Sequence, residues 1–213
     1  MQIRHFVFNP LMENTYVLYE ADQHVCVVID PGCVGEKECS RLGDFIDRND
    51  LRLLGVLCTH LHFDHQMGNR YLHDRYHVEP MAMKADLFLA QEARQMASMF
   101  AGIEDGVMGY DVTRFIQDEQ QITLGPFRFS VLATPGHTPG GCCFYMPDEQ
   151  IVFTGDTLFQ GSVGRADFEY SSYADLIDGI QSRLLSLPDD TYVLPGHGPA
   201  TTIGFERLNN PFL

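Results

Sequence analysis

The chain has 213 residues, and its 45% hydrophobic and 20% charged content is that of a globular domain rather than a disordered segment. Its net charge of −15 excludes nucleic acid and anionic membrane surfaces as favoured partners, because both bind through lysine and arginine. The N-terminus shows no signal-peptide pattern, and no stretch has the length of a membrane helix. The six cysteines form no CxxC pair, so we expect a cytoplasmic protein with free thiols.

Strands and turns dominate the first part of the chain. β-Rich runs that end in turn residues predict strands, and apolar residues at helical spacing predict helices. The second helix follows a buried strand, and Asp64 is placed to cap it. The predicted order is strand 5–10, strand 14–20, strand 24–32, helix 36–50, strand 51–60 and helix 64–76.

Residues 84–121 differ in character from the segments around them. The run "KADLFLAQEARQMASMF" is rich in good helix formers, and "AGIEDGVMGYD" after it predicts a loop. We therefore predict a single domain over residues 1–213 with a helix–loop insertion at about 84–121. Met96, Met99 and Phe100 of this helix either form an apolar wall of a substrate site or pack as an ordinary amphipathic face.

β Character returns after residue 121 and repeats the order of the first half. The predicted strands cover 121–137, 140–147, 150–157 and 191–199, and a helix covers 171–188. This helix is capped by its opening serines and has Leu176, Ile180 and Leu184 on one face. Two halves that each run from strands to a helix predict an α/β fold of two packed sheets with helices outside.

Four apolar strands end in histidine or aspartate, in "LLGVLCTHLHFDH", "FSVLATPGH", "IVFTGDT" and "YVLPGH". Strand ends gather at one edge of a sheet, and imidazole with carboxylate suits zinc, iron or manganese. Such crowding beside buried strands is costly unless a cation compensates it. The candidate ligands are His60, His62, Asp64, His65, His137, Asp156 and His197. Seven ligands exceed one tetrahedral ion and predict two divalent ions, roughly 3.5–4 Å apart, that share a carboxylate and a water.

Through "THLHFDH", "TPGHTPGG", "FTGDTLF" and "PGHGP", in this order, the sequence resembles the metallo-β-lactamase superfamily over essentially its whole length. The resemblance implies an αββα sandwich of two mixed β-sheets flanked by helices, with the metals at one edge of the sheets. It implies a first metal held by His60, His62 and His137, a second held by Asp64, His65 and His197, and a bridging Asp156. Two zinc ions are the expected cofactor, with iron or manganese as alternatives.

Within the superfamily, "GDTLFQGSVGRADF" and "PGHGPATTIGFERLNNPFL" resemble the short bacterial type of glyoxalase II, the hydroxyacylglutathione hydrolases. The long type has an additional C-terminal helical region with basic residues, which we do not expect in this protein. The resemblance implies hydrolysis of a small-molecule thioester such as S-lactoylglutathione, by attack of a metal-bridging hydroxide on the carbonyl. Asp64 would orient the hydroxide and transfer its proton. Arg165 matches a substrate-binding basic residue of glyoxalase II, or it forms a structural ion pair with Asp167 or Glu169.

Three other functions are compatible with these motifs. A mononuclear-iron persulfide dioxygenase of the same superfamily shares HxHxDH and a "GRxDF" segment but typically lacks the "GHGP" form that contains His197 here. A lactonase would direct the same hydroxide at a lactone carbonyl. A non-catalytic zinc-stabilised binding protein belongs to a different class, in which four ligands, often cysteines, usually hold the ion. Thr59 and Asp30 are candidates for orienting the ligands, and Asp30 in "IDPG" is also a candidate turn residue.

Overall fold

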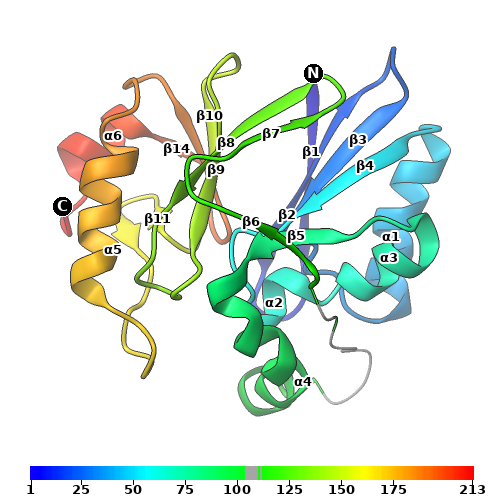
Figure 1. Ribbon diagram of the computed structural model, residues 1–213, viewed down its shortest axis with the longest axis horizontal. Coiled ribbons are helices and arrows are strands. Elements are labelled where there is room, and N and C mark those ends of the chain that lie inside the picture. The colour runs from blue at the N-terminus through cyan, green and yellow to red at the C-terminus, as the bar shows by residue number, and fades with distance from the viewer. Residues whose placement is uncertain (104–109, 111) are drawn as a thin grey trace.

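The computed structural model describes residues 1–103, 110 and 112–213, and within them two six-stranded β-sheets pack face to face. Helices cover the outer face of each sheet, so that the layers run helix, sheet, sheet, helix (Figure 1). Each sheet contains both parallel and antiparallel neighbours. The predicted αββα sandwich of two mixed sheets is therefore confirmed.

The first sheet is built by the N-terminal half of the chain. Its strands, in hydrogen-bonded order, are β1 (Gln2–Phe8), β2 (Glu13–Glu20), β3 (Val25–Ile29), β4 (Arg52–Leu57), β5 (Pro80–Met83) and β6 (Arg114–Ile116). The first three are antiparallel neighbours, whereas β3 to β6 are parallel. The β3 sequence "VCVVI" is buried throughout, as expected for a strand covered on both faces.

The second sheet is built by the C-terminal half. Its strands are β7 (Gln121–Leu124), β8 (Phe127–Ala133), β9 (Cys142–Met146), β10 (Ile151–Gly155), β13 (Tyr192–Pro195) and β14 (Thr201–Thr202), in the order β14-β13-β10-β9-β8-β7. A ribbon of β11 (Leu158–Phe159) and β12 (Ser162–Val163) is separate from it. Because β9 is antiparallel to both β8 and β10, and β13 is parallel to β10, the strands β8, β10 and β13 run in one direction.

The helices divide between the two sheets. α1 (Gly35–Arg48) and α3 (Asn69–Tyr76) pack on the first sheet, and α5 (Tyr173–Gly179) and α6 (Ile203–Asn209) pack on the second, at opposite sides of Figure 1. The Ser172 hydroxyl caps α5 by accepting from the Asp175 amide at 3.3 Å, which confirms the predicted cap. α5 continues into a π-helical turn (Ile180–Leu184). The remaining helices of the described chain are α2 (Phe63–Gln66), η1 (Lys84–Asp86) and α4 (Leu87–Ala101).

The main core lies between the two sheets. Leu18, Val27, Phe129, Phe144 and Phe153 are among its members, and none of them is more than 1% exposed. Burying each such side chain contributes roughly 1.5–3 kcal/mol. This packed interior gives the loops at the strand ends a rigid base.

The helix predicted over 64–76 is in fact two helices, α2 and α3. The chain is interrupted after Met67, where the Gly68 amide donates to Pro31 O at 2.7 Å. Asp64 is not an N-cap, because His62 holds that position and Asp64 lies in the first turn of α2. The prediction of a terminal cap was therefore wrong, and the Asp64 side chain is available to the site.

The region predicted as a helix–loop insertion contains more than a helix and a loop. α4 occupies the predicted helix, but β6 joins the first sheet beside β5, and three residues are too few to show a strand pattern in sequence. Residues 104–109 and 111 of the predicted loop lie outside the described part of the chain. The insertion itself stays a prediction. Among the described residues, no helix combines the length and the apolarity of a membrane span.

Candidate metal centre

The predicted ligands follow strand ends that meet at one edge of the sandwich. The segment from His60 to His65 follows β4, His137 follows β8, Asp156 follows β10 and His197 follows β13. Backbone hydrogen bonds join the two sheets there. The Cys142 amide donates to Thr59 O at 2.9 Å, and the Asn14 amide donates to Gly196 O at 2.7 Å. The fold therefore brings polar loops from both halves of the chain to one place.

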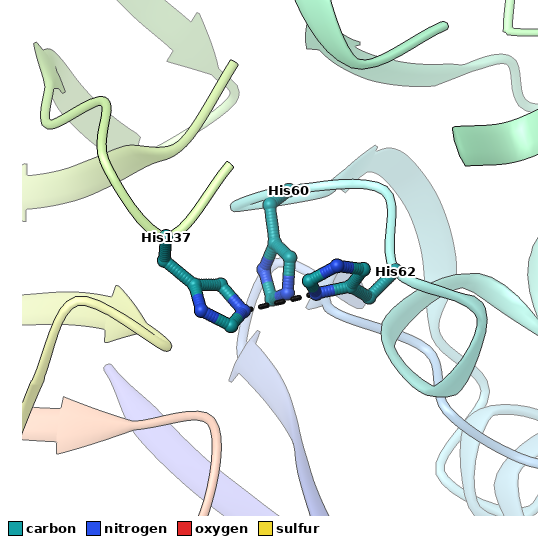
Figure 2. A group of neighbouring side chains, drawn as sticks. All are labelled: His60, His62 and His137. Atoms are coloured by element: carbon teal, nitrogen blue, oxygen red, sulfur yellow. Dashed lines mark hydrogen bonds between the residues drawn. The ribbon is translucent and has the colours of Figure 1, made fainter. Parts of the chain in front are cut away.

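His60, His62 and His137 form the first group of candidate ligands. One ring nitrogen from each lies within 4.8 Å of the others, and all three side chains are buried. Figure 2 shows the three rings close together, with His137 Nε2 2.9 Å from His62 Nδ1. Three imidazoles around one point are a donor set that suits zinc or iron.

Asp64, His65 and His197 form the second group, within the same distance limit. His197 Nε2 lies 3.2 Å from Asp64 Oδ2 and 3.3 Å from His65 Nε2. Asp156 lies between the groups, with Oδ1 3.4 Å from His65 Nε2 and Oδ2 3.6 Å from His137 Nε2. All seven predicted residues thus come together, and the Asp156 carboxylate reaches both groups.

Each of the five histidines has one ring nitrogen hydrogen-bonded to the protein and turns its other nitrogen to the site. The pairs are His60 Nδ1 with Thr59 Oγ1 (3.1 Å), His62 Nε2 with Tyr170 Oη (2.8 Å), His65 Nδ1 with Asp30 Oδ2 (3.1 Å), His137 Nδ1 with Arg165 O (2.7 Å) and His197 Nδ1 with Leu11 O (3.1 Å). For His65, His137 and His197 the partner is a carboxylate or carbonyl oxygen, which can only accept, so the bonded nitrogen carries the proton. The opposite nitrogen is then the one available to a metal.

The charges of the site match what metal binding requires. Burial lowers the pKa of His62 to about 3 and the pKa of His60 well below its usual value, so both rings are neutral near pH 7. Burial raises the pKa of Asp156, but the imidazoles of His65 and His197 lower it well below its ordinary value. Burial lowers the pKa of His65, but the carboxylates of Asp156 and Asp64 raise it, and the net result lies well above the ordinary value of a histidine. Ionised carboxylates beside the neutral rings of His60 and His62 favour a cation, and His65 has to lose its proton when an ion binds.

Two buried atoms at the centre have no hydrogen-bond partner among the described residues, namely His60 Nε2 and Asp156 Oδ1. Leaving a buried polar atom unpaired costs about 1–3 kcal/mol. His60, His65 and Asp156 also form a set whose ligand atoms lie within 4.8 Å of one another. A divalent cation between these atoms would satisfy both, so the residues present fit a metal. The chain has a His/Asp metal-binding cluster.

Asp30 both turns the chain and orients the site. Its Oδ1 accepts from the Thr59 amide at 2.7 Å, and its Oδ2 accepts from the Thr59 hydroxyl at 2.6 Å and from His65 Nδ1. Its φ of +48° turns the backbone after β3. Glu13, wholly buried, forms a further group with Asp30 and His65, and burial raises the pKa of its carboxyl. Asp30 is therefore both a turn residue and a residue that orients the candidate ligands, the two roles predicted for it.

Two residues that support the site were not predicted. Tyr170 lies 108 positions from His62 and binds its Nε2, and nothing in "DFEY" indicates this partner. Asp86 is buried and accepts from the Leu61 amide at 3.2 Å and from the Thr138 hydroxyl at 2.8 Å. It thereby ties the loop of the first ligands to the loop of His137. In sequence Asp86 resembles only a helix cap.

A cavity of about 380 Å³ opens onto both groups of ligands. His62, Asp64, Asp156 and His197 line it, and so does Arg165. This volume is within the range of small-molecule sites, about 300–1,000 Å³. The candidate ligands therefore face a space that admits a substrate.

Arg165 lines this cavity and also makes an ion pair. Its guanidinium donates to both carboxylate oxygens of Asp167 at 2.7 and 2.9 Å, and it lies 4.4 Å above the Phe168 ring. Of the two acids considered as partners, the structure selects Asp167. Met96 of α4 also lines the cavity, whereas Met99 is 65% exposed. The side chain of Phe100, named with them, lies outside the described part.

Comparison with known proteins shows which family and which relatives this chain is similar to. The family model described as "Metallo-beta-lactamase superfamily" matches residues 8–197, a range that contains all seven candidate ligands. Hydroxyacylglutathione hydrolase GloC of Haemophilus influenzae is 36% identical over 214 residues, which cover 100% of this chain and 98% of GloC.

Two solved structures superpose over nearly the whole chain. One is BLEG-1, described as a B3 metallo-β-lactamase, which is 33% identical with a TM-score of 0.90 over 100% of this chain and 99% of BLEG-1. The other is TTHA1623 in a di-iron-bound form, which is 36% identical with a TM-score of 0.86 over 99% of this chain and 100% of TTHA1623. The predicted family resemblance is therefore confirmed, and divalent metal use is supported by both the cluster and a metal-bound neighbour.

Proposed function

We propose, on the premise that the chain belongs to the metallo-β-lactamase superfamily and is a metallo-hydrolase, that it hydrolyses thioesters of the S-lactoylglutathione class with two divalent ions. Zinc is our first choice of metal, with iron or manganese as alternatives. We place the reaction in the cytoplasm, where the six free cysteines would stay reduced.

The observation that carries this proposal is the arrangement of the five imidazoles. Each has one nitrogen bonded to the protein and the other directed at the same centre, and Asp156 lies between the two groups. A structural zinc site usually closes around four ligands, whereas five of these seven residues line an open cavity. We therefore assign His60, His62 and His137 to one ion, Asp64, His65 and His197 to the other, and Asp156 to both.

When bound, two divalent ions lower the pKa of a shared water and polarise the substrate carbonyl. The chain supplies the remaining functions. Asp64 Oδ2 faces the cavity 3.2 Å from His197 Nε2, where it can orient the attacking water and receive its proton. The bonds from Asp30, Thr59 and Tyr170 hold the imidazoles in one orientation, so that little reorganisation is needed during reaction.

The substrate class rests on the relatives and on the cavity wall. GloC, whose name is that of a hydroxyacylglutathione hydrolase, matches over the whole chain. Arg165 at the cavity wall offers a cation for a carboxylate of an anionic thiol, and Phe168 and Met96 offer apolar surface to the acyl or thiol chain. We therefore expect anionic thioesters to bind better than neutral ones.

Elemental analysis of the protein purified without chelator, followed by assays on S-lactoylglutathione and on a neutral thioester, tests the proposal. We expect about two metal ions per chain and release of a free thiol. His62→Ala should lose metal and hydrolysis together while the circular dichroism spectrum is kept. His24→Ala, a surface histidine outside the site, is the matched control and should keep both.

Other results would redirect the assignment. Full thioesterase activity in His62→Ala would refute the metal mechanism. About one iron per chain, with no second ion taken up on titration and oxygen consumed with a persulfide, would identify a dioxygenase. Hydrolysis confined to lactones or β-lactams would keep the metallo-hydrolase and change its substrate.

A further inference from the structure

Cys33 and Cys39 form a pair of thiols close to the metal centre. Cys33 lies in the loop between β3 and α1, and Cys39 lies in the second turn of α1. Their sulfur atoms are 3.6 Å apart, and the Cys39 thiol also contacts Cys33 O at 3.7 Å. The two sulfurs need to approach by roughly 1.6 Å to reach the disulfide bond length of about 2.05 Å.

Cys39 differs chemically from the other five cysteines, including Cys33, whose pKa is raised by its hydrogen bond with Cys39 and by burial. Burial raises the pKa of Cys26, Cys58 and Cys143 to about 12, so these thiols do not ionise near neutral pH. The Cys33 thiol, by hydrogen bonding, lowers the pKa of Cys39, and Cys39 is half-buried rather than buried. A half-buried thiol 3.6 Å from a second thiol, with a pKa below the ordinary value, has the arrangement of a reactive dithiol.

A cavity gives small molecules access to Cys39. It has a volume of about 510 Å³ and is separate from the cavity at the metal groups. Cys39 and Ser40 of α1 line one side, and Met67, Arg70 and Tyr71 line the other. This space is large enough for the disulfide of a small thiol.

We propose that Cys33 and Cys39 form a thiol–disulfide exchange site that closes to an intramolecular disulfide when it reacts with the disulfide of a low-molecular-weight thiol. The Cys39 thiolate attacks one sulfur of the small disulfide, so that its S–S bond breaks and one thiolate leaves. Cys33 then gives up its proton and attacks the Cys39 sulfur of the mixed disulfide, and the second thiolate leaves. The two cysteines are oxidised, one small disulfide is reduced, and two thiols are released.

Closure of the disulfide would act on the metal centre through the loop that ends β3. The Cys33 sulfur packs against Gly68, and the Gly68 amide donates to Pro31 O at 2.7 Å. The same loop begins with Asp30, which holds Thr59 and His65. Drawing Cys33 toward α1 moves it away from Gly68. On the proposed function, hydrolysis by the oxidised protein therefore falls several-fold and returns on reduction.

The test exposes the metal-loaded protein to 2-hydroxyethyl disulfide, blocks free thiols with N-ethylmaleimide and analyses tryptic peptides without reduction. Trypsin cleaves at Lys37, so a Cys33–Cys39 disulfide joins two separate peptides. We expect this joined pair, a loss of two of the six free thiols, and full blocking of the other four only after unfolding. Cys33→Ala should instead keep the small thiol on Cys39 as a stable mixed disulfide.

Absence of the joined peptides in wild type, with Cys33 and Cys39 both recovered as free thiols, would overturn the exchange site. This result does not depend on any substrate, so it is distinct from failure of the proposed hydrolysis. Thioester hydrolysis before and after oxidation then tests the link to the metal centre. Unchanged hydrolysis in the oxidised protein would overturn that link, and Cys39→Ser, which cannot close, should be insensitive to the oxidant.

Discussion

Tyr170 fixes which nitrogen of His62 is available to a metal. Its hydroxyl binds His62 Nε2 at 2.8 Å, and its ring stacks on Phe168, which in turn lies beside the His62 ring. Removing the hydroxyl alone frees the imidazole to rotate or to change tautomer without a change in packing. The tyrosine is therefore a positioning residue for the first group of ligands.

Tyr170→Phe should weaken metal binding at the first group by about tenfold, the usual size of losing a partner of a ligating histidine. Competition with a chromophoric chelator measures this directly and does not depend on turnover. Tyr173→Phe, whose side chain is exposed, is the matched control and should leave affinity unchanged. Equal affinity in Tyr170→Phe and wild type would contradict the positioning role.

Arg165 forms an ion pair with Asp167 and also lines the cavity at the candidate metal centre. Arg165→Ala should raise KM for an anionic thioester about fivefold, corresponding to roughly 1 kcal/mol for an exposed ion pair, and leave a neutral thioester unaffected. Steady-state kinetics on both substrates provide the measurement. Equal changes for the two substrates would mean that Arg165 only supports the local structure.

Competition between protons and a metal ion for the histidine nitrogens should weaken metal binding mainly at the second group of candidate ligands, Asp64, His65 and His197. The pKa of His65 and the pKa of His197 are raised by nearby carboxylates despite burial, whereas the pKa values of His60 and His62 are lowered. A metal binds the unprotonated ring, so a proton must leave His65 or His197 as the ion enters. Affinity at the second group should therefore rise with pH, and affinity at the first group should rise less. Metal titrations from about pH 5.5 to 8 test this, and identical pH profiles would refute it.

Among the elements, the short helix η1 matters through its last residue. Asp86 accepts hydrogen bonds from Leu61 and Thr138, so one carboxylate holds two ligand-bearing loops. Asp86→Ala leaves these buried donors without an acceptor and should lower the free energy of unfolding by about 3 kcal/mol. Urea unfolding of chelator-treated protein separates this effect from metal loss. Asp74→Ala, at an exposed ion pair on α3, should leave the free energy of unfolding nearly unchanged. Similar losses for both variants would mean that Asp86 does not hold the two loops together.

The elements also show where sequence reasoning succeeds and fails. That the seven candidate ligands lie together could be predicted because long apolar strands end beside them, and strand ends gather at one edge of a sheet. β6 could not be predicted, because a strand of three residues is too short to show periodicity. The break between α2 and α3 could not be predicted either, because it involves a hydrogen bond to Pro31, which is distant in sequence. Tyr170 and Asp86 act through contacts across 108 and 52 positions, which a single sequence does not display.

At the scale of the whole molecule, net charge opposes an anionic substrate. With a charge of −15, the protein repels anions at a distance, although the proposed metal ions would make the site itself positive. Raising the ionic strength from about 10 to 150 mM should therefore increase kcat/KM for an anionic thioester by a few-fold. A neutral thioester should show little change. A fall in kcat/KM with salt would mean that attraction by the site outweighs the overall repulsion.

The two halves of the chain contribute candidate ligands in nearly equal shares, so on the proposed function each bound ion would cross-link the two sheets. The first group joins His60 and His62 of one half to His137 of the other, and the second joins Asp64 and His65 to His197. If two ions bind as proposed, separating the sheets would require breaking metal–ligand bonds on both, because either half alone supplies only part of each group. The lifetime of the native state is thereby linked to the residence time of its metals, so that a cell's supply of the ion would decide how long each molecule survives as well as whether it works.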